Sequence, residues 1–179
     1  MDNIKAIFMD LDGTVLTSGH KVSKNLIKKL RELEGKGVKT FVATGRTFSS
    51  SKPFVEMLGI KNPVINYNGG RVVNPLNSEV IFEKPIEAQD VEELIKVSRE
   101  KGIHLNLYMD DKLYIEHETE EGEKYSESVE IPYYVRNFDE FIGKSSTKAL
   151  FIAENSILLE LKKELEEKLP HLNFVFSKP

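Results

Sequence analysis

Two short apolar runs, separated by a helix-like stretch and each ended by polar and glycine residues, constrain this chain's fold more than any other feature. Residues 4–9 are almost continuously apolar, which is typical of a strand buried on both faces of a parallel sheet. Residues 38–43 form a second run, rich in β-branched and aromatic side chains. Between them, Ser23 is placed to cap a helix that ends near Gly35. This order predicts a βαβ unit, whose parallel strands end on the same edge of the sheet.

The motif Asp10-Leu11-Asp12-Gly13-Thr14 directly follows the first predicted strand. Residues two apart in an extended backbone share a face, so Asp10 and Asp12 can point toward one spot beyond the strand end. Two carboxylates held that close repel each other unless they share a proton or a cation. A hard divalent cation such as Mg²⁺ suits their oxygen ligands. Gly13 allows a tight turn there, and Thr14 adds a hydroxyl group.

The same residues have two other interpretations. Asp, Gly and Thr commonly occupy an ordinary turn between a strand and a loop. A calcium loop of the EF-hand type would need an oxygen ligand at the position of Thr14, a glycine after it and a flanking helix. A strand is predicted where that helix would lie, which argues against the calcium loop.

Thr44-Gly45-Arg46 stands at the end of the second predicted strand. The βαβ unit brings it to the edge that carries Asp10 and Asp12, and in open α/β sheets ligands bind at that edge. The Thr44 hydroxyl can donate a hydrogen bond, Gly45 permits a close backbone approach, and the planar fork of Arg46 matches phosphate oxygens. Taken alone, the triplet is more typical of a turn followed by a surface arginine, and the aspartate motif at the same edge shifts the interpretation to a phosphate site.

A third strand is predicted over residues 63–66, after a helix that lies somewhere within 48–58 and closes at Gly59. It ends in Tyr67-Asn68-Gly69-Gly70, so polar and glycine residues again follow a strand. Asn68 can serve either as a turn residue or as a ligand contact. A hairpin is predicted to follow, with strands at 71–73 and 80–82.

The pattern changes at Pro85, which predicts two domains, 1–84 and 85–179. The second contains helices and antiparallel strands without a loop of catalytic character, as in an α+β module. Its predicted elements are a helix over 88–101, a hairpin over 103–115 that turns at Asp110-Asp111, an exposed acidic helix or loop over 118–128, a strand over 147–153, a helix capped by Ser156 and ending at Leu169, and a last strand over 172–176.

Composition and charge argue against several kinds of partner and location. The net charge is −4, and no clustered basic surface is evident in the sequence, so we expect no nucleic-acid partner. No stretch is long and apolar enough to span a membrane, and no signal peptide is visible. The chain has no Cys, which is compatible with a reducing compartment. We therefore expect a cytoplasmic protein without a membrane partner.

The three polar motifs after the predicted strands resemble the first half of a Cof-type phosphatase of the haloacid dehalogenase superfamily, type IIB. The segment from Asn106 to Tyr114 and the strand beginning at Thr147-Lys148 resemble the α+β cap of that family. The resemblance implies an α/β fold. It also implies a Rossmann-like core with a partial parallel sheet over residues 1–84 and an inserted, incomplete α+β cap over 85–179.

The resemblance also implies roles for single residues. Asp10 would be the nucleophile that forms an aspartyl-phosphate, and Asp12 would protonate the leaving alkoxide and later deprotonate water. Mg²⁺ would be held by the Asp10 carboxylate and the Asp12 backbone carbonyl. Thr44 would bind the phosphoryl oxygens, and further phosphate or substrate contacts are expected at Gly45, Arg46, Asn68 and Gly69. The implied substrate is a small phosphorylated metabolite, such as a sugar phosphate.

The sequence departs from the family pattern in two respects. It has no counterpart of the family's later lysine or of its later Gly-Asp-rich metal loop, because Lys148 and Lys178 lie in the cap region. We therefore expect a fragment, a truncated form or one piece of an assembly, with the first strand unpaired along one edge and open to self-association.

Two other functions remain open for such a chain. One is a non-catalytic module that binds phosphate and metal, or a partner, without turnover. The other is a phosphosugar mutase, which is less favoured because those relatives usually carry a smaller helical cap.

Overall fold

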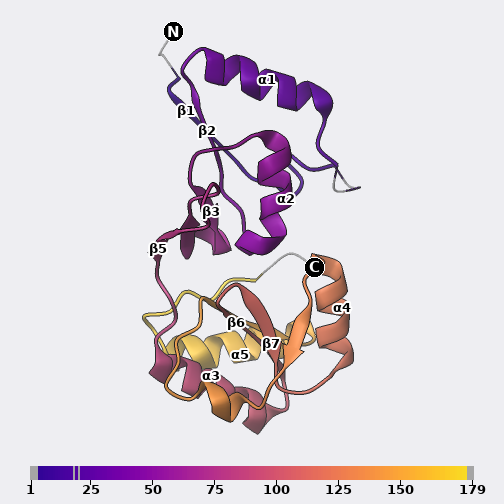
Figure 1. Ribbon diagram of the computed structural model, residues 1–179. Helices are drawn as coiled ribbons and strands as arrows, with labels where there is room; N and C mark the ends of the chain where they lie inside the picture. The colour runs from indigo at the N-terminus through magenta and orange to yellow at the C-terminus, as the bar shows by residue number, and fades with distance from the viewer. Residues whose placement is uncertain (1–3, 18, 20, 177–179) are drawn as a thin grey trace. The chain divides into compact units, whose positions relative to one another are not determined.

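A computed structural model describes residues 4–17, 19 and 21–176 (Figure 1). The chain divides into two compact units, Met1–Lys84 and Pro85–Pro179, called here the N-terminal and the C-terminal unit. Each unit has its own buried core and is described by itself. None of the helices among the described residues has the length and apolar character that crossing a membrane requires.

The N-terminal unit begins with the expected βαβ arrangement. Its elements are β1 (Ala6–Met9), α1 (Lys24–Gly35), β2 (Lys39–Val42), α2 (Phe48–Leu58), β3 (Val64–Asn66), the 3₁₀ turn η1 (Tyr67–Gly69), β4 (Arg71–Val73) and β5 (Val80–Glu83). Strands β1 and β2 pair in parallel, which confirms the prediction. Strands β3, β4 and β5 form an antiparallel sheet, and a parallel bridge between Ala43 and Ile65 joins the end of β2 to β3.

Local signals set the ends of both helices, and those at Ser23 and Gly59 were predicted. The Ser23 hydroxyl accepts a hydrogen bond from the backbone N–H of Asn25 at the start of α1. At the start of α2, the Thr47 hydroxyl accepts from the backbone N–H of Ser50. Helix α2 ends at Gly59, which has a left-handed φ of 74°. The residues that carry polar motifs therefore lie just outside well-defined elements.

Strand β1 is not buried on both faces, which corrects the expectation from its apolar sequence. Met9 is its only buried residue, whereas the side chain of Phe8 is 60% exposed and stacks on Phe41 with ring centroids 4.6 Å apart. Helices α1 and α2 pack against the face that carries Met9 and Val42. Within the described residues, β1 pairs with β2 alone, so its other edge has no strand partner.

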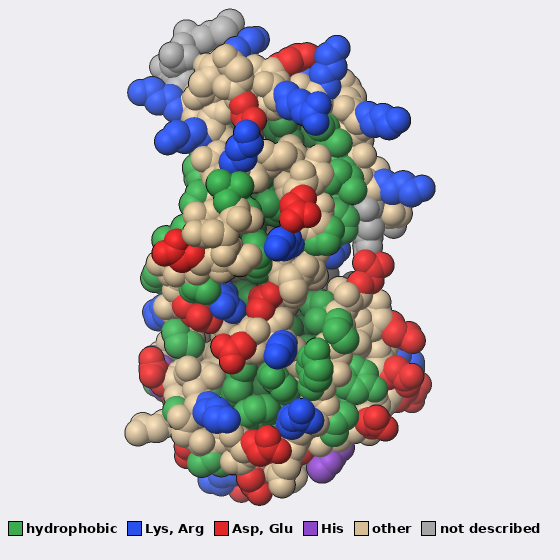
Figure 2. Space-filling model, viewed as in Figure 1, with side chains coloured by type: hydrophobic (Ala, Val, Ile, Leu, Met, Phe, Trp, Pro, Cys, Tyr) green, Lys and Arg blue, Asp and Glu red, His purple; other side chains and the backbone are tan. Residues whose placement is uncertain are grey.

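Helix α1 presents a basic outer face. Lys24, Lys28 and Arg31 line a shallow surface hollow together with Ile27 and Glu32, and Lys and Arg side chains gather at this end of the unit in Figure 2. These cations recur at helical spacing, three or four residues apart, so one face of the helix carries them all. This local cluster is an exception to the expected lack of a basic surface.

The C-terminal unit is built around a mixed four-stranded sheet with the order β8-β7-β6-β9. Its elements are α3 (Ala88–Lys101), β6 (His104–Met109), β7 (Lys112–Ile115), α4 (Glu120–Val129), β8 (Tyr133–Val135), the 3₁₀ turn η2 (Phe138–Phe141), β9 (Lys148–Ile152) and α5 (Asn155–Lys168). Strand β6 is antiparallel to β7 and β9, and β8 is parallel to β7. The acidic segment, left open between helix and loop, forms α4, which Thr119 caps.

Three details of the C-terminal unit differ from the sequence predictions, and one strand is buried on both faces. Residues 172–176 form no strand, because they pair with none of the described strands. Helix α5 begins at Asn155 after Glu154, so Ser156 lies inside it and is not its cap. Strand β8 was not predicted. Strand β6 is buried on both faces, because α3 and α5 pack on the Leu105 side while α4 covers the other, where the Tyr108 hydroxyl donates to that of Tyr125 at 2.8 Å.

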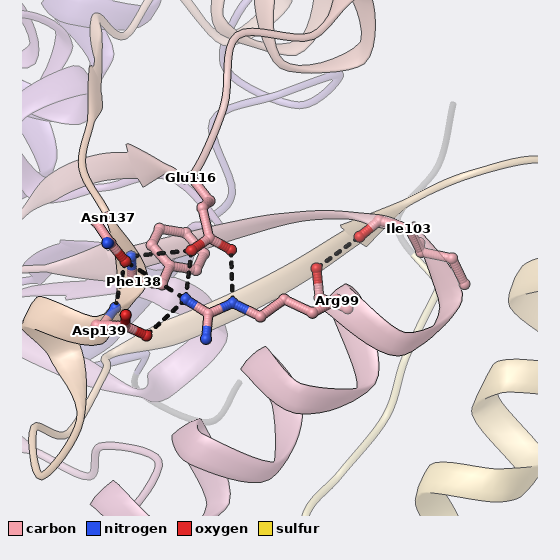
Figure 3. A network of polar contacts seen from close by, with 7 residues as sticks. Arg99, Ile103, Glu116, Asn137, Phe138 and Asp139 are labelled. Atoms are coloured by element: carbon pink, nitrogen blue, oxygen red, sulfur yellow. Dashed lines mark hydrogen bonds and ion pairs between the residues drawn. The ribbon is translucent and has the colours of Figure 1, made fainter.

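An ion-pair network holds α3, β7 and η2 together (Figure 3). Arg99 donates through Nη2 to Glu116 Oε1 at 2.5 Å and to Asp139 Oδ1 at 2.8 Å. Glu116 also accepts from the backbone N–H of Phe138 at 3.2 Å. Burial alone would raise the pKa of Glu116, but the hydrogen bonds and charge of Arg99, together with the Phe138 N–H, outweigh it and lower the pKa below 4.5.

Candidate active site

The loops that follow β1, β2 and β3 are hydrogen-bonded to one another. The backbone N–H of Ala43 donates to the Met9 carbonyl at 2.9 Å, and that of Thr44 to the Ile65 carbonyl at 2.9 Å. The N–H of Asn68 in turn donates to the Thr44 carbonyl at 3.1 Å. These bonds gather loops 10–14, 44–47 and 67–69 at one place, called here the strand-end edge.

Arg46 binds Asp12 at this edge through two nitrogen atoms of its guanidinium, Nε and Nη2. Nε donates to Asp12 Oδ2 at 2.8 Å and Nη2 to Oδ1 at 2.7 Å. The Arg46 side chain is only 13% exposed, and its guanidinium lies 5.2 Å from the centroid of the Phe54 ring. Two parallel charge-assisted bonds of this kind fix the orientation of a carboxylate. The expected phosphate ligand Arg46 therefore contacts one of the two predicted catalytic aspartates directly.

Leu11 anchors the loop that carries the two aspartates. Its side chain is fully buried, and its carbonyl accepts hydrogen bonds from the N–H groups of Val15 at 3.1 Å and Leu16 at 2.8 Å. Asp10 and Asp12, on either side of Leu11, are both exposed. The turn after them passes through Gly13, whose φ of +72° suits glycine.

Thr44, Gly45 and Asn68 lie against one another at the strand-end edge. Thr44 is buried, and its hydroxyl oxygen accepts from the backbone N–H of Arg46 at 3.2 Å. No acceptor for its hydroxyl hydrogen is found among the described residues. A Cβ on Gly45 would lie 3.0 Å from Asn68 Oδ1, so this contact requires glycine unless Asn68 moves. Asn68 is exposed in the left-handed region, followed by the exposed Gly69.

Asn66 is a residue of this edge that the sequence prediction missed. It is fully buried at the end of β3, and its side-chain amide donates to the carbonyls of Arg46 at 3.2 Å and Thr47 at 3.3 Å. A signal was available: Asn66 lies two residues after Val64, so it shares that residue's inward face, where a buried strand normally carries an apolar side chain.

The oxygen atoms at the edge can be compared with what Mg²⁺ requires. Among the described residues, no three His, Asp or Glu side chains come together as a metal cluster. Both Asp12 carboxylate oxygens accept from Arg46, which leaves the Asp10 carboxylate and backbone carbonyls as oxygen ligands. Mg²⁺ commonly binds one or two protein oxygens and completes its shell with waters and substrate phosphate, so this donor set is compatible with it.

Lys148 and Lys178, the two lysines weighed as counterparts of the family's later lysine, both belong to the C-terminal unit. Lys148 lies in β9 with its Nζ 5.3 Å from the centroid of the Tyr108 ring. Lys178 lies outside the described residues.

Comparison with known proteins extends over nearly the whole chain. The family model of haloacid dehalogenase-like hydrolases matches residues 7–179. A candidate phosphatase of Haemophilus influenzae is 28% identical over 174 residues, which cover 97% of this chain and 66% of that protein. An HMP-PP phosphatase of Yersinia pseudotuberculosis is 25% identical over 169 residues, which cover 94% of this chain and 62% of that one.

The fold is shared with solved structures. The crystal structure of a Thermotoga maritima protein, TM0651, matches with a TM-score of 0.83 and 28% identity, over 98% of this chain and 66% of that chain. This confirms the α/β fold implied by the resemblance. The chain spans less than two thirds of the length of each of these three proteins. Because the family match runs from the first strand through the last residue, the chain belongs to the haloacid dehalogenase-like hydrolase family.

Proposed function

We propose that the protein is a Mg²⁺-dependent phosphatase of small phosphorylated metabolites, which works through an aspartyl-phosphate on Asp10. The observation that carries the proposal is the bidentate ion pair between Arg46 and Asp12, two residues from the exposed Asp10. Family membership and the relatives described as phosphatases support the same chemistry. The HMP-PP phosphatase favours a small phosphate ester or anhydride, and a sugar phosphate belongs to the same substrate class.

The reaction proceeds in two displacements. The Asp10 carboxylate attacks phosphorus, a new O–P bond forms, and the bond to the leaving oxygen breaks as Asp12 protonates that oxygen. Water then attacks the aspartyl-phosphate, Asp12 takes the proton, and inorganic phosphate and the Asp10 carboxylate are released. Asp12 regains from water the proton that it gave to the leaving oxygen, so the cycle is balanced.

The contact with Arg46 affects the two roles of Asp12, as acid for the leaving oxygen and as base for water, in different ways. A carboxylate that accepts two hydrogen bonds from a guanidinium is ionised, which suits the base that receives the proton of water. To act as the acid, Asp12 has to carry a proton, and one of its oxygens must leave the Arg46 fork. A substrate phosphate at the edge offers the released N–H another acceptor, which couples substrate binding to the acid form.

The remaining edge residues hold the phosphoryl group. The Thr44 hydroxyl donates to a phosphoryl oxygen, and the backbone around Gly45, Asn68 and Gly69 makes further contacts. Mg²⁺ would be held by the Asp10 carboxylate and the Asp12 backbone carbonyl, and when bound it neutralises charge on the phosphoryl oxygens.

We assign the N-terminal unit to the catalytic core and the C-terminal unit to an incomplete substrate-gating cap. The protein is proposed to be cytoplasmic, without a nucleic-acid or membrane partner. It is also proposed to self-associate through the open edge of β1, since the exposed Phe8 lies there and an unpaired strand readily adds another.

A second candidate is a phosphate- and metal-binding or interaction module without turnover. The observation that favours it is that no three His, Asp or Glu side chains gather as a metal cluster among the described residues.

The deciding experiment is hydrolysis of an aryl phosphate by the purified chain, with Mg²⁺ and with a chelator, followed by HMP-PP and sugar phosphates. Asp10→Asn should abolish the activity. Asp110→Asn, in the exposed turn after β6, is the matched control and should leave it unchanged. Folded protein that binds Mg²⁺ and phosphate but releases no product would contradict the phosphatase and support the binding module.

A further inference from the structure

Asn66 is a fully buried polar side chain at the strand-end edge, and all its donor contacts go to one segment, residues 46–51. Its Nδ2 donates to the carbonyls of Arg46 at 3.2 Å and Thr47 at 3.3 Å, and to the Ser51 hydroxyl at 3.0 Å. Thr47 caps α2 and Ser51 lies in its first turn. A single amide therefore ties the end of β3 to the entrance of α2.

The segment that Asn66 holds is the one that aims Arg46. The Arg46 carbonyl accepts from Asn66 and also from the backbone N–H of Tyr67, at 3.2 Å. With its carbonyl fixed from β3 and its own N–H bound to the Thr44 hydroxyl, the Arg46 backbone has little freedom to rotate. Its guanidinium then reaches Asp12 at hydrogen-bond distance.

We propose that Asn66 is a positioning residue, which sets the bidentate contact between Arg46 and Asp12 by fixing the backbone of the 44–47 turn. A side chain that only filled space could not do this. It would leave the Arg46 and Thr47 carbonyls with their backbone donors, the N–H groups of Tyr67 and Ser51, and would remove the hydrogen bond that ties Thr47 to β3. The inference concerns the geometry of the ion pair and holds whether or not the chain turns over a phosphate ester.

Arg71 supports Asn66 from the neighbouring strand. The two residues are directly opposite each other in the antiparallel pair β3–β4, so their side chains lie on the same face. Within the described part of the chain, Asn66 Oδ1 accepts no hydrogen bond, and Arg71 Nε and Nη1 donate none, although all three atoms are buried.

One acceptor and two donors on adjacent strands can satisfy each other, directly or through one internal water. This contact would also hold the amide in the orientation that its Nδ2 bonds need. Glu83 does not replace it, since its Oε2 is 3.9 Å from Arg71 Nε.

The test reads the ion pair itself by NMR. The Nε–H cross-peak of Arg46 in the whole chain is identified by its loss in Arg46→Lys, and its shift in Asp12→Asn shows the position without the partner. In Asn66→Leu we expect the cross-peak to move toward the Asp12→Asn position. Arg71→Met should move it in the same direction by a smaller amount.

Asn62→Leu is the matched control. Asn62 also donates from its side-chain amide to a backbone carbonyl, that of Thr40 at 3.0 Å, but it precedes β3 and so lies at the opposite end of that strand. Its replacement should leave the Arg46 cross-peak in place. An unchanged cross-peak in a folded Asn66→Leu chain, or an equal shift in Asn62→Leu, would overturn the proposal. If Asn66→Leu loses the dispersed amide spectrum, Arg71→Met decides, and an unmoved cross-peak there overturns the proposal.

Discussion

Arg46 holds both carboxylate oxygens of Asp12, through Nε at 2.8 Å and Nη2 at 2.7 Å. The two residues are 34 positions apart in the sequence and come from the ends of adjacent parallel strands. Their contact fixes the carboxylate that flanks Asp10 and gives Arg46 a role before any phosphate arrives. The central claim, that this edge performs phosphoryl transfer, depends on that geometry.

Arg46→Lys should reduce hydrolysis strongly and stability little. Lysine keeps the charge but presents a single point donor, so it cannot hold both Asp12 oxygens. A catalytic group that is misplaced by about 1 Å costs about 100-fold in rate. Because half of the Asp12 side chain is exposed, the free energy of unfolding should fall by only about 0.2 to 1 kcal/mol. Steady-state kinetics and thermal melts check both values, with Arg31→Lys on exposed α1 as control. Unchanged kinetics would refute the role of the fork.

Gly45→Ala should weaken substrate binding. The new Cβ would lie 3.0 Å from Asn68 Oδ1, so Asn68 has to move away from the edge. We expect KM to rise with a smaller change in kcat, because a phosphate contact is lost while Asp10 and Asp12 stay in place. Gly35→Ala is the control, since its Cβ would meet nothing within 4 Å. Equal KM values in the two variants would show that Asn68 does not touch the substrate.

The sequence predicted the elements that depend on local signals. The βαβ unit, the caps at Ser23 and Gly59 and the gathering of polar loops at one edge all follow from strand, cap and turn patterns. The sequence could not predict which side chains contact one another. Arg46 was expected at a phosphate or substrate, and its contact with Asp12 depends on side-chain geometry that spacing does not encode.

Burial was the other quantity that local pattern could not determine. An apolar run such as 4–9 indicates what a strand can bury, and the neighbours that cover it are set elsewhere in the fold. Thus Phe8 is exposed, and Leu172–Phe176 remains without a strand partner among the described residues although its sequence is strand-like. Asn66 was missed although its spacing from Val64 places it on the inward face of β3, because the bonds that it makes to the 46–51 segment depend on tertiary packing.

The ionised Glu116 should stabilise the C-terminal unit near neutral pH, and this stabilisation should be lost in acid. The folded pKa of Glu116 lies below its ordinary value of 4.5, so its contribution is complete above pH 4.5 and is lost as the pH falls through the folded pKa. Glu116→Gln should therefore reduce the free energy of unfolding by about 1 to 3 kcal/mol at neutral pH. The gap between parent and variant should shrink below pH 4.5.

Denaturant titrations at several pH values measure this gap. Glu118→Gln, at an exposed position two residues away, is the matched control and should show no such gap. A difference between Glu116→Gln and the parent that stays constant through the acid range would contradict the ion-pair account.

Phe8→Lys should suppress self-association. Phe8 is 60% exposed beside the open edge of β1, and a charge there discourages the pairing of another strand. Sedimentation velocity over a range of concentrations should show the parent associating and Phe8→Lys remaining monomeric. Leu76→Lys is the control, because Leu76 is 72% exposed in the turn between β4 and β5. If both variants associate as the parent does, the contact lies elsewhere.

The most direct test of the central claim is to locate the phosphoryl group on the protein. The chain is mixed with an aryl phosphate and Mg²⁺, quenched in acid and digested, and its peptides are analysed by mass spectrometry. We predict phosphorylation of Asp10, with more label in Asp12→Asn, where water attack lacks its base, and none in Asp10→Asn. Phosphate release without label on Asp10, or label on another residue, would contradict the mechanism. If folded protein shows no phosphate release and no label, the chain is a binding module.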